Sequence, residues 1–340
     1  MTLRRKCLHA LIGLVLLLAA CDGGDSADGA GNGGPVQRII VVLPNPSAIV
    51  VANLCAAIGE GYLADEGIEV RVEAVDGSGA VLQALTAGQG QIGLPGPGPV
   101  LNARVQGEEP VMFYNHYAQS LFGIVVPEDS DVQSVEDLEG TTVGVGTVDG
   151  TEVTFSRAIL DEVGLQQDSD YEFLPVGDGG PATAAFERGE IDAYAAALPD
   201  MVIIESRGLT INEITPENYL SLFGNGYTAM QDYIDQNAET VEGFAAAITR
   251  GTEFAQDNKE ETLEHCSEIN PEEGADTELA SDLYDFLVPR TEPLEGAEFG
   301  AFDAEAWQRW HDAMIDSGEL EQEVDDIDSA YTNQFVESGS

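Results

Sequence analysis

The chain has 340 residues, 43% of them hydrophobic, and its 62 acidic and 13 basic residues give a formal net charge of −49. This hydrophobic fraction excludes a disordered acidic chain, and the negative charge disfavours nucleic acid or an anionic membrane surface as a partner. Lys6 and Lys259 are the only lysines. Such a surface is typical of a protein that works in high salt, where ions screen its self-repulsion. We therefore expect it to unfold on dialysis to low salt.

The first residues have the layout of a secretion signal. A basic start at residues 4–6 precedes an apolar run at residues 11–19, which is too short to span a bilayer comfortably. The run ends in Leu-Ala-Ala-Cys at residues 18–21, which resembles a bacterial lipobox. The resemblance implies removal of residues 1–20 and attachment of diacylglycerol to the sulfur of Cys21. A plain signal peptide with an accidental cysteine is the alternative.

Residues 21–36 are a low-complexity stretch of mainly Gly, Asp and Ser. The stretch has too little apolar surface to fold, so we expect a flexible tether between the lipid and the folded part. Signal, lipobox and tether together predict a protein outside the cytoplasm that is held at the cell membrane by a lipid anchor.

From residue 37 onward, short apolar runs alternate with helical patterns, which is typical of an α/β fold. We expect strands at Gln37–Leu43, Ile68–Val75, Gln91–Leu94, Pro110–Tyr114, Leu121–Val126, Val143–Val145, Tyr171–Val176, Ile191–Ala196 and Tyr219–Met230. Outside the glycine-loop units described below, we expect helices at Ile49–Leu63, Val100–Val105, Ser134–Leu138, Val241–Asn258, Thr277–Leu287, Asp303–Asp316, and more weakly at Leu320–Asp325 and Ala330–Phe335. Residues 95–99 read as a stiff, proline-rich loop.

The stretch Thr142–Leu160 has the pattern of a small-ligand cradle. A β-branched strand runs into a glycine-rich loop at residues 146–150, and a helical pattern starts at Thr151. The start of a helix presents backbone N–H groups without intrahelical partners and the positive end of a dipole. An ordinary turn between a strand and a helix is the alternative.

A loose internal repeat predicts two similar lobes. From Val75 to Gly88 the chain has the end of a strand, a glycine loop and a helix. A second unit with the same layout runs from Val176 to Gly189, and both of its ends lie the same number of residues further along the chain. Two similar α/β units in one chain suggest two lobes with a crevice between them. We expect the first lobe to comprise residues 37–117 and 228–337, and the second to comprise residues 118–227.

The cysteines and histidines suggest no metal site and no cofactor. The chain has no CxxC motif, and its four histidines lack the spacing of metal ligands. Cys55 and Cys266 remain after the signal and lipobox cysteines are set aside. A disulfide is permitted outside the cytoplasm, but the two lie so far apart in the sequence that we favour two separate buried thiols.

Four segments, at residues 132–146, 189–193, 237–244 and 331–335, resemble the substrate-binding proteins of ABC importers in their sequence and order. The resemblance runs from about Ile39 to Phe335. It is strongest to the branch that binds nitrate, aliphatic sulfonates, taurine, riboflavin or the pyrimidine precursor of thiamine. It implies the type II periplasmic-binding fold, with two α/β lobes, two crossings and a ligand in the cleft. It also implies a monomer that delivers its ligand to a permease with its ATPase.

In that fold the loops after the strands line the cleft. Glycine and serine let the backbone approach a ligand, threonine and asparagine hydrogen-bond to it, and Tyr117 can stack on a ring. The resemblance nominates Asn45, Ser47, Ser78, Gly79, Pro95 and Gly96 in the first lobe, His116 and Tyr117 at the hinge, and Thr147, Asp149, Gly150, Thr151, Asp178, Leu198 and Pro199 in the second lobe.

The nominated loops contain no Lys or Arg, the groups that anionic ligands favour. We therefore expect a neutral or weakly basic heteroaromatic ligand, such as a pyrimidine precursor of thiamine or a flavin, with Asp149 or Asp178 accepting from its N–H groups. An anion such as sulfonate, taurine or nitrate stays open, because helix N-termini alone can hold one.

An enzyme is the alternative of another class. Pyrimidine synthases share the implied fold, but they carry a cysteine-rich, histidine-assisted iron site that has no counterpart here. A dinucleotide-binding enzyme is disfavoured because Asp149 stands where the GxGxxG motif requires glycine. A sensor subunit that hands its ligand to a signalling receptor stays open beside an importer component.

Overall fold

The structure is a computed structural model that describes residues 36–336 except residues 149, 221, 295, 317 and 321. The predicted signal peptide, the lipidation site Cys21, the tether up to residue 35 and the candidate Asp149 lie outside the described residues. The chain from Pro35 onward forms one compact unit, to which everything below refers.

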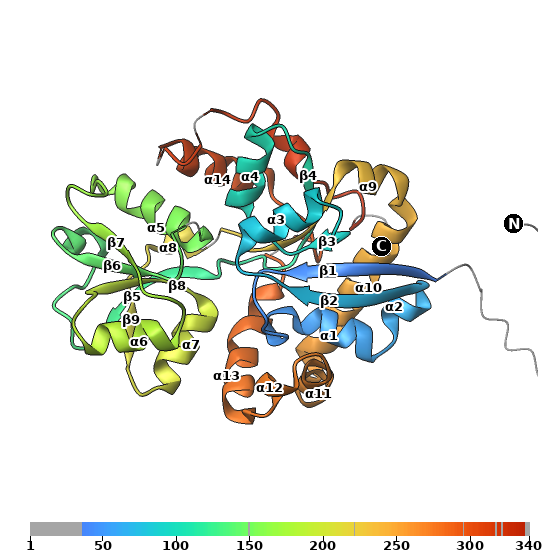
Figure 1. Cartoon of the computed structure of the whole chain (residues 1–340), viewed down its shortest axis with the longest axis horizontal. Coiled ribbons are helices and arrows are strands. Elements are labelled where there is room, and N and C mark those ends of the chain that lie inside the picture. Colours follow the sequence, from blue (N-terminus) through green and yellow to red (C-terminus); the bar gives the residue numbers. More distant parts are fainter. Residues whose placement is uncertain are drawn as a thin grey trace, which may run out of the picture. The chain divides into compact units, whose positions relative to one another are not determined.

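Two five-stranded sheets with the same pattern of strand directions organise this unit (Figure 1). The first sheet has the order β2-β1-β3-β10-β4 and the second the order β7-β6-β8-β5-β9. In each sheet the first three strands are parallel, and one strand, β10 or β5, runs antiparallel to both of its neighbours. The two lobes predicted from the internal repeat therefore correspond to two sheets of matching topology.

The strands lie close to their predicted positions. The first sheet contains β1 (Gln37–Leu43), β2 (Ile68–Ala74), β3 (Ile92–Gly93), β4 (Pro110–Asn115) and β10 (Gly226–Met230). The second contains β5 (Phe122–Pro127), β6 (Thr142–Val145), β7 (Glu172–Pro175), β8 (Ala193–Ala197) and β9 (Ile211–Glu213). The short edge strand β9 was not predicted, because only its first residue is apolar.

The predicted strand Tyr219–Met230 is wrong over its first half. Residues Glu217–Leu220 form the short helix α8, and β10 begins only at Gly226. Tyr219 packs its ring edge-on against Phe155 with centroids 5.7 Å apart, and its hydroxyl donates to the carbonyl of Ala158 at 3.3 Å. Packing on the neighbouring helix therefore overrides the strand propensity of this segment.

Two helix predictions need correction near the first sheet. The expected helix Ile49–Leu63 is divided into η1 (Ile49–Val51), α1 (Ala52–Gly59) and α2 (Tyr62–Asp65), with a break at Gly61, whose φ of 76° is left-handed. The helix α4 (Pro97–Val105) begins inside the predicted proline-rich loop. Proline is tolerated in the first turn because its missing N–H has no partner there.

The remaining helices surround the sheets. They are α3 (Ser78–Thr86), η2 (Val135–Leu138), α5 (Thr151–Glu162), α6 (Gly180–Glu187), α7 (Leu198–Ser206), α9 (Gln231–Gln236), α10 (Ala238–Asp257), α11 (Lys259–Ile269), α12 (Pro271–Gly274), α13 (Thr277–Leu287), η3 (Val288–Thr291), α14 (Ala304–Asp316) and η4 (Ile327–Ala330). The helices predicted at 320–325 and 330–335 are wrong, since η4 ends at Ala330 and the other described residues there form bends, turns, an isolated bridge or no regular structure. None of the described helices is long and apolar enough to cross a membrane.

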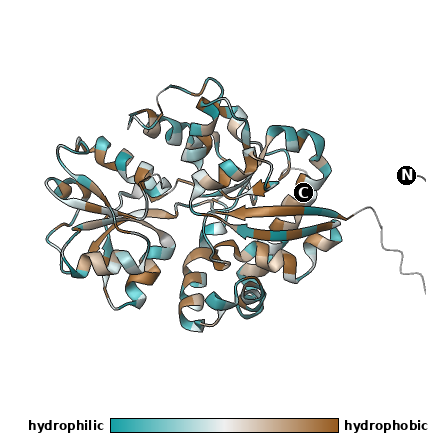
Figure 2. Cartoon of the chain, in the orientation of Figure 1, coloured by the Kyte–Doolittle hydropathy of each residue, from teal (hydrophilic) through white to brown (hydrophobic). Residues whose placement is uncertain are grey.

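The core follows the strands. Figure 2 shows hydrophobic residues concentrated on the strands and hydrophilic residues on the outward faces of the helices. Helix α14 contributes Trp307 and Trp310, both fully buried, and it packs against α4 and α5. The Arg157 guanidinium on α5 forms an ion pair with Glu319, just after α14, and both side chains are mostly buried. The C-terminal segment thus ties a helix next to the first sheet to a helix of the second.

Cys55 and Cys266 form a disulfide, which corrects the prediction of two separate thiols. Cys55 lies in α1 and Cys266 in α11, and their Cα atoms are 5.0 Å apart. The long helix α10 packs along α1 and brings α11 back beside it. The pairing therefore depends on tertiary packing that the spacing of the two cysteines did not indicate.

Candidate functional site

A cavity of about 550 Å³ is lined by residues that follow strands of both sheets. The parallel strands of each sheet end at the wall of this cavity. The loops after these strands supply most of the lining, as expected for ligand sites in α/β proteins. Nine of the predicted site residues line it: Asn45, Ser47, Ser78, Tyr117, Thr147, Gly150, Thr151, Asp178 and Pro199.

Four predicted residues do not line this cavity: Gly79, Pro95, Gly96 and His116. Gly79 lies in the first turn of α3. The Pro95 carbonyl accepts a hydrogen bond from the Gly226 amide at 3.2 Å, and the Gly96 amide donates to Ser78 Oγ at 3.1 Å. These two residues therefore support the wall from behind. Leu198 begins α7, and its side chain is not described.

Sequence reasoning missed several lining residues. The apolar and polar additions are Val50, Leu121, Phe122, Ile203, Asn225 and Leu287, and the acidic ones are Asp76, Glu152 and Asp200. Each acidic residue lies within two positions of a predicted site residue in the sequence, so the expectation that loops after strands line the cavity could have included it. Ile203 and Leu287 lie inside or at the end of helices that reach the cavity only through tertiary packing.

On the side of the first sheet, the uncharged polar side chains of Asn45, Ser78 and Asn225 are engaged within the protein, while the Asp76 carboxylate also lines the cavity. Asn45 Oδ1 accepts from the Ser47 amide at 3.0 Å, and Asn225 Nδ2 donates to the Leu94 carbonyl at 2.9 Å. Because Ser78 Oγ also accepts a backbone amide, as above, this wall presents shape and apolar surface more than free hydrogen-bonding capacity.

The hinge residues hold one backbone carbonyl in place. The Tyr117 hydroxyl donates to the Val50 carbonyl at 2.6 Å, and His116 Nε2 donates to the same oxygen at 2.8 Å. Asn53 Nδ2 donates to His116 Nδ1 at 2.9 Å, which fixes the neutral tautomer with its proton on Nε2. Burial lowers the pKa of His116 to about 4. His116 is thus a structural residue behind the wall, while Tyr117 contributes ring surface to the cavity.

The side of the second sheet carries most of the charge. Asp200 accepts from the Ala197 amide at 3.2 Å and from the Tyr194 hydroxyl at 3.3 Å. Complete burial raises its pKa well above the ordinary value, and the charges of Asp178 and Glu152 raise it further. A Cβ at Gly146 would meet the Asp178 carboxylate, so a larger residue there would push that side chain aside.

Asp178 and Thr151 are the residues of this wall whose side chains lack a hydrogen bond among the described residues. Burial raises the pKa of Asp178, and the Asp76 carboxylate from the first sheet's side raises it further. Among the described residues, the Asp178 side chain makes no hydrogen bond, and the buried Thr151 Oγ1 has no hydrogen-bond partner. The Asp178 carboxylate is therefore available to a bound molecule, whereas Thr151 Oγ1 lies below the accessible surface beside Gly96.

The whole lining contains acidic but no basic residues among those described. The acidic groups do not converge on a metal, since no described group of three or more His, Cys, Asp or Glu residues is arranged to hold one. Tyr117 and Phe122 add aromatic surface. Chemically, the cavity suits a molecule with a flat apolar body and N–H groups that donate to carboxylates.

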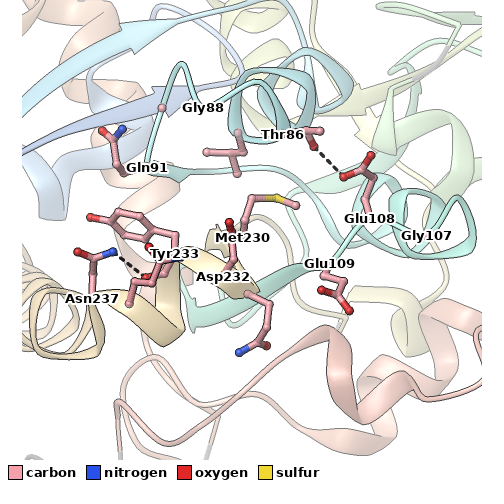
Figure 3. A pocket seen from close by; sticks show the side chains of 14 residues that line it. Thr86, Gly88, Gln91, Gly107, Glu108, Glu109, Met230, Asp232, Tyr233 and Asn237 are labelled. Carbon is pink, nitrogen blue, oxygen red and sulfur yellow. Dashed lines mark hydrogen bonds between the residues drawn. The ribbon is translucent and has the colours of Figure 1, made fainter.

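A second cavity of about 490 Å³ lies at the other end of the strands of the first sheet. Figure 3 shows the residues that line it. Gln91 before β3, Glu109 before β4 and Met230 at the end of the antiparallel β10 contribute to its lining. None of the predicted site residues reaches it. Because ligands of such sheets bind where the parallel strands end, the cavity between the two sheets is the candidate site.

The chain is similar to two proteins that are named for binding small molecules. The chain is 27% identical over its full length to the riboflavin-binding protein RibY of Chloroflexus aurantiacus, of which 99% is covered. It is 24% identical to a formylaminopyrimidine-binding protein of Halalkalibacterium halodurans, over 89% of this chain and 92% of that one.

Among solved structures, the fold is similar to that of the periplasmic aliphatic sulphonate binding protein SsuA of Escherichia coli. The TM-score is 0.68 at 18% identity, over 87% of this chain and 92% of that one. The two α/β lobes therefore form a periplasmic-binding-protein fold. The model of the family described as NMT1/THI5 like matches residues 48–262, which is more than half of the chain. This chain belongs to the NMT1/THI5-like family.

Proposed function

We propose that this chain is an extracytoplasmic solute-binding protein that captures a small heteroaromatic metabolite and delivers it to an ABC importer. The observation that carries the proposal is the cavity between the sheets, whose lining combines Tyr117 and Phe122 with four carboxylates and no basic residue. The relatives named for binding riboflavin and formylaminopyrimidine support a ligand of this class. A pyrimidine precursor of thiamine or a related molecule is the first candidate.

In this proposal the ligand lies between lobe 1 (residues 37–117 and 228–337) and lobe 2 (residues 118–227). Tyr117 stacks on the ring, while Asp178 accepts from its N–H groups. Binding closes the lobes by a hinge motion, with the two crossings absorbing the change. The closed form then docks on the permease, which works with its ATPase.

The proposal places the protein outside the cytoplasmic membrane, held there by a lipid on Cys21 after removal of residues 1–20. The lipobox-like residues 18–21 support this anchor. Mass spectrometry of the protein from the membrane fraction tests it. A Cys21→Ser variant should lose the diacylglycerol mass and appear in the soluble extracellular or periplasmic fraction.

A binding role without catalysis is favoured over an enzyme, because the relatives are named as binding proteins. An anion ligand is disfavoured by the carboxylates of the lining, since like charges in a partly desolvated cavity repel. An importer component is favoured over a sensor subunit by the similarity to such binding proteins.

The direct test is mass spectrometry of the ligand that the protein retains after mild purification in high salt. The proposal predicts a heteroaromatic mass released on denaturation of the protein. Retention of a sulfonate, taurine or nitrate, with no heteroaromatic compound, would contradict it.

A further inference from the structure

Gly96 and Thr151 meet at the boundary between the two lobes. Gly96 is the last residue before α4, on the side of the first sheet, and Thr151 is the first residue of α5, on the side of the second. Helices α4 and α5 pack against one another (Figure 1). A Cβ placed on Gly96 would lie 2.5 Å from Thr151 Oγ1, 3.1 Å from its Cγ2 and 3.3 Å from its Cβ. The two segments come this close because residue 96 has no side chain.

The backbone at Gly96 would accept another residue. Its φ of −79° and ψ of 168° are extended angles that any residue can adopt. Thr151 is buried, and rotation about its χ1 moves Oγ1 and Cγ2 but leaves its Cβ in place. An alanine at residue 96 would therefore push Thr151, and with it the start of α5, away from α4.

Gly96 itself is fixed to the first lobe. Its amide donates to Ser78 Oγ at 3.1 Å, and the preceding carbonyl, of Pro95, accepts from the Gly226 amide at 3.2 Å. Gly226 begins β10, the strand with which the chain returns to the first sheet. Because Gly96 is tied to the end of a crossing, a small displacement there becomes a larger one at the far rim of the cavity.

We propose that Gly96 is a positioning residue that sets how far the two lobes close over a ligand. Thr151 lines the cavity, so its contact with Gly96 fixes how closely the second wall approaches the first. A side chain at residue 96 makes the closed form less populated, and the apparent affinity falls with that population. This inference rests on the proposed function, because it assumes that the lobes close over a ligand.

The test compares Gly96→Ala with the wild type and with Gly98→Ala by calorimetry in high salt. The probes are riboflavin and 4-amino-2-methylpyrimidine. Gly98 is the matched control, because it lies in the first turn of the same α4 and is also buried. A Cβ on Gly98 would have its nearest neighbour, Met314 Sδ, at 3.5 Å, which is an ordinary contact.

A second readout follows closure without relying on ligand affinity. Spin labels are placed on Gln83 in α3 and Glu187 in α6, which are exposed and lie on different lobes. Cys55 and Cys266 do not take up label, because they form the disulfide. The distance between the labels is measured without ligand and with each heterocycle, and it is compared with the distance in the structure.

We expect Gly96→Ala to bind a heterocycle about tenfold or more weakly than the wild type, because one extra methyl group overpacks the contact in the closed form. Its label distance should be longer, and Gly98→Ala should match the wild type in both readouts. In a Thr151→Ala background, which lacks Oγ1 and Cγ2, the same change at Gly96 should cost less than about threefold.

Four results would overturn the inference. Gly96→Ala could match Gly98→Ala in label distance, or in affinity for a heterocycle that the wild type binds. The wild type could never show the label distance of the structure. The penalty of Gly96→Ala could be unchanged in the Thr151→Ala background. Finally, Gly96→Ala could fail to fold, which would mean that the collision is not confined to the closed form.

The two readouts separate this inference from the proposed function. If the wild type binds neither heterocycle but shows the label distance of the structure, and Gly96→Ala loses it, the ligand assignment fails and the role of Gly96 stands. If the wild type binds a heterocycle, and Gly96→Ala binds it equally well and closes to the same distance, the ligand assignment stands and the role of Gly96 fails.

Discussion

The two walls of the candidate cavity use their polar groups differently. In the wall of the first sheet, Ser47, Ser78 and Asn225 are all engaged in hydrogen bonds within the protein. In the wall of the second sheet, the side chains of Asp178 and Thr151 make no hydrogen bond among the described residues. The two sheets thus present one wall whose uncharged polar side chains are satisfied, with the Asp76 carboxylate beside them, and one wall that contains unpaired polar groups.

The difference indicates that the two walls of the cavity contribute differently to ligand recognition. A satisfied wall contributes a fixed shape, because its groups gain nothing from reorienting toward a ligand. An open wall loses free energy if its buried polar groups stay unpaired, so a ligand that pairs with them is bound selectively. We therefore expect the first wall to matter for stability and the second for affinity.

The largest expected effect is a loss of folding stability when the disulfide next to the first wall is removed. Replacing Cys55 and Cys266 together by serine should lower the free energy of unfolding by roughly 2–5 kcal/mol, because the disulfide closes a long loop. Urea unfolding in high salt measures the loss. A reductant should destabilise the wild type and leave the variant unchanged. Equal midpoints for both proteins would show that the cross-link does not support this wall.

The second effect is acid sensitivity at the hinge. The pKa of His116 is about 4 in the folded protein and about 6.5 when unfolded, so its contribution to stability is complete above pH 6.5 and is lost as the pH falls toward 4. The loss amounts to about 3 kcal/mol. Unfolding free energies measured between pH 7 and pH 4 should fall less steeply for His116→Gln. Parallel profiles would exclude His116 as the cause.

The third effect is on affinity and belongs to the open wall. Asp178→Asn should weaken binding of the heteroaromatic ligand by about 2 kcal/mol, roughly 30-fold, because a hydrogen bond to a charged acceptor is lost. Calorimetry measures the change. Glu187→Gln, an exposed acidic residue on the helix that follows Asp178, is the control and should bind normally. Equal ligand affinities for Asp178→Asn and Glu187→Gln would show that Asp178 does not contact the ligand.

The open wall should also show a pH dependence opposite to that of His116. Burial raises the pKa of Asp200 in the folded protein, so stability is present below the unfolded pKa and is lost as the pH rises through the folded pKa. Asp200→Asn keeps an acceptor for the Ala197 amide and the Tyr194 hydroxyl. Its melting temperature should exceed that of the wild type at pH 8 and match it at pH 4. If Asp200→Asn were less stable than the wild type at pH 8, the predicted direction of the pH dependence would be wrong.

The smallest effect is expected at Tyr117. Its hydroxyl donates to the Val50 carbonyl, which also accepts from His116, so Tyr117→Phe should cost about 1 kcal/mol of stability or less. The ring is kept, and ligand affinity should change by less than about threefold. A larger loss in calorimetry would mean that the hydroxyl itself contacts the ligand.

The sequence was sufficient for the parts of the fold and site that local chemistry determines. Strand β1 has its predicted bounds, and the glycine loops before Thr151 and after Val176 lead into helices as expected. The loop residues Asn45, Ser78 and Asp178 line one cavity because they follow strands that end at the same place.

Other features depend on packing between distant segments. Glu273, whose carboxylate accepts hydrogen bonds from the Ser47 hydroxyl and the Ala48 amide, lies on a four-residue helix that has no apolar pattern to reveal it. Leu287 reaches the cavity because α13 packs against α7, and Cys55 meets Cys266 because α10 returns the chain. Such contacts are set by how helices dock, and no local pattern in the sequence encodes them.

The most direct test of the account is a calorimetric titration of the wild-type protein, in high salt, with an aminopyrimidine and riboflavin against methanesulfonate and nitrate. We predict saturable binding of at least one heterocycle and no measurable heat from either anion. Tight binding of methanesulfonate or nitrate with no response to the heterocycles would contradict the division of the cavity into a satisfied wall and an open acidic one.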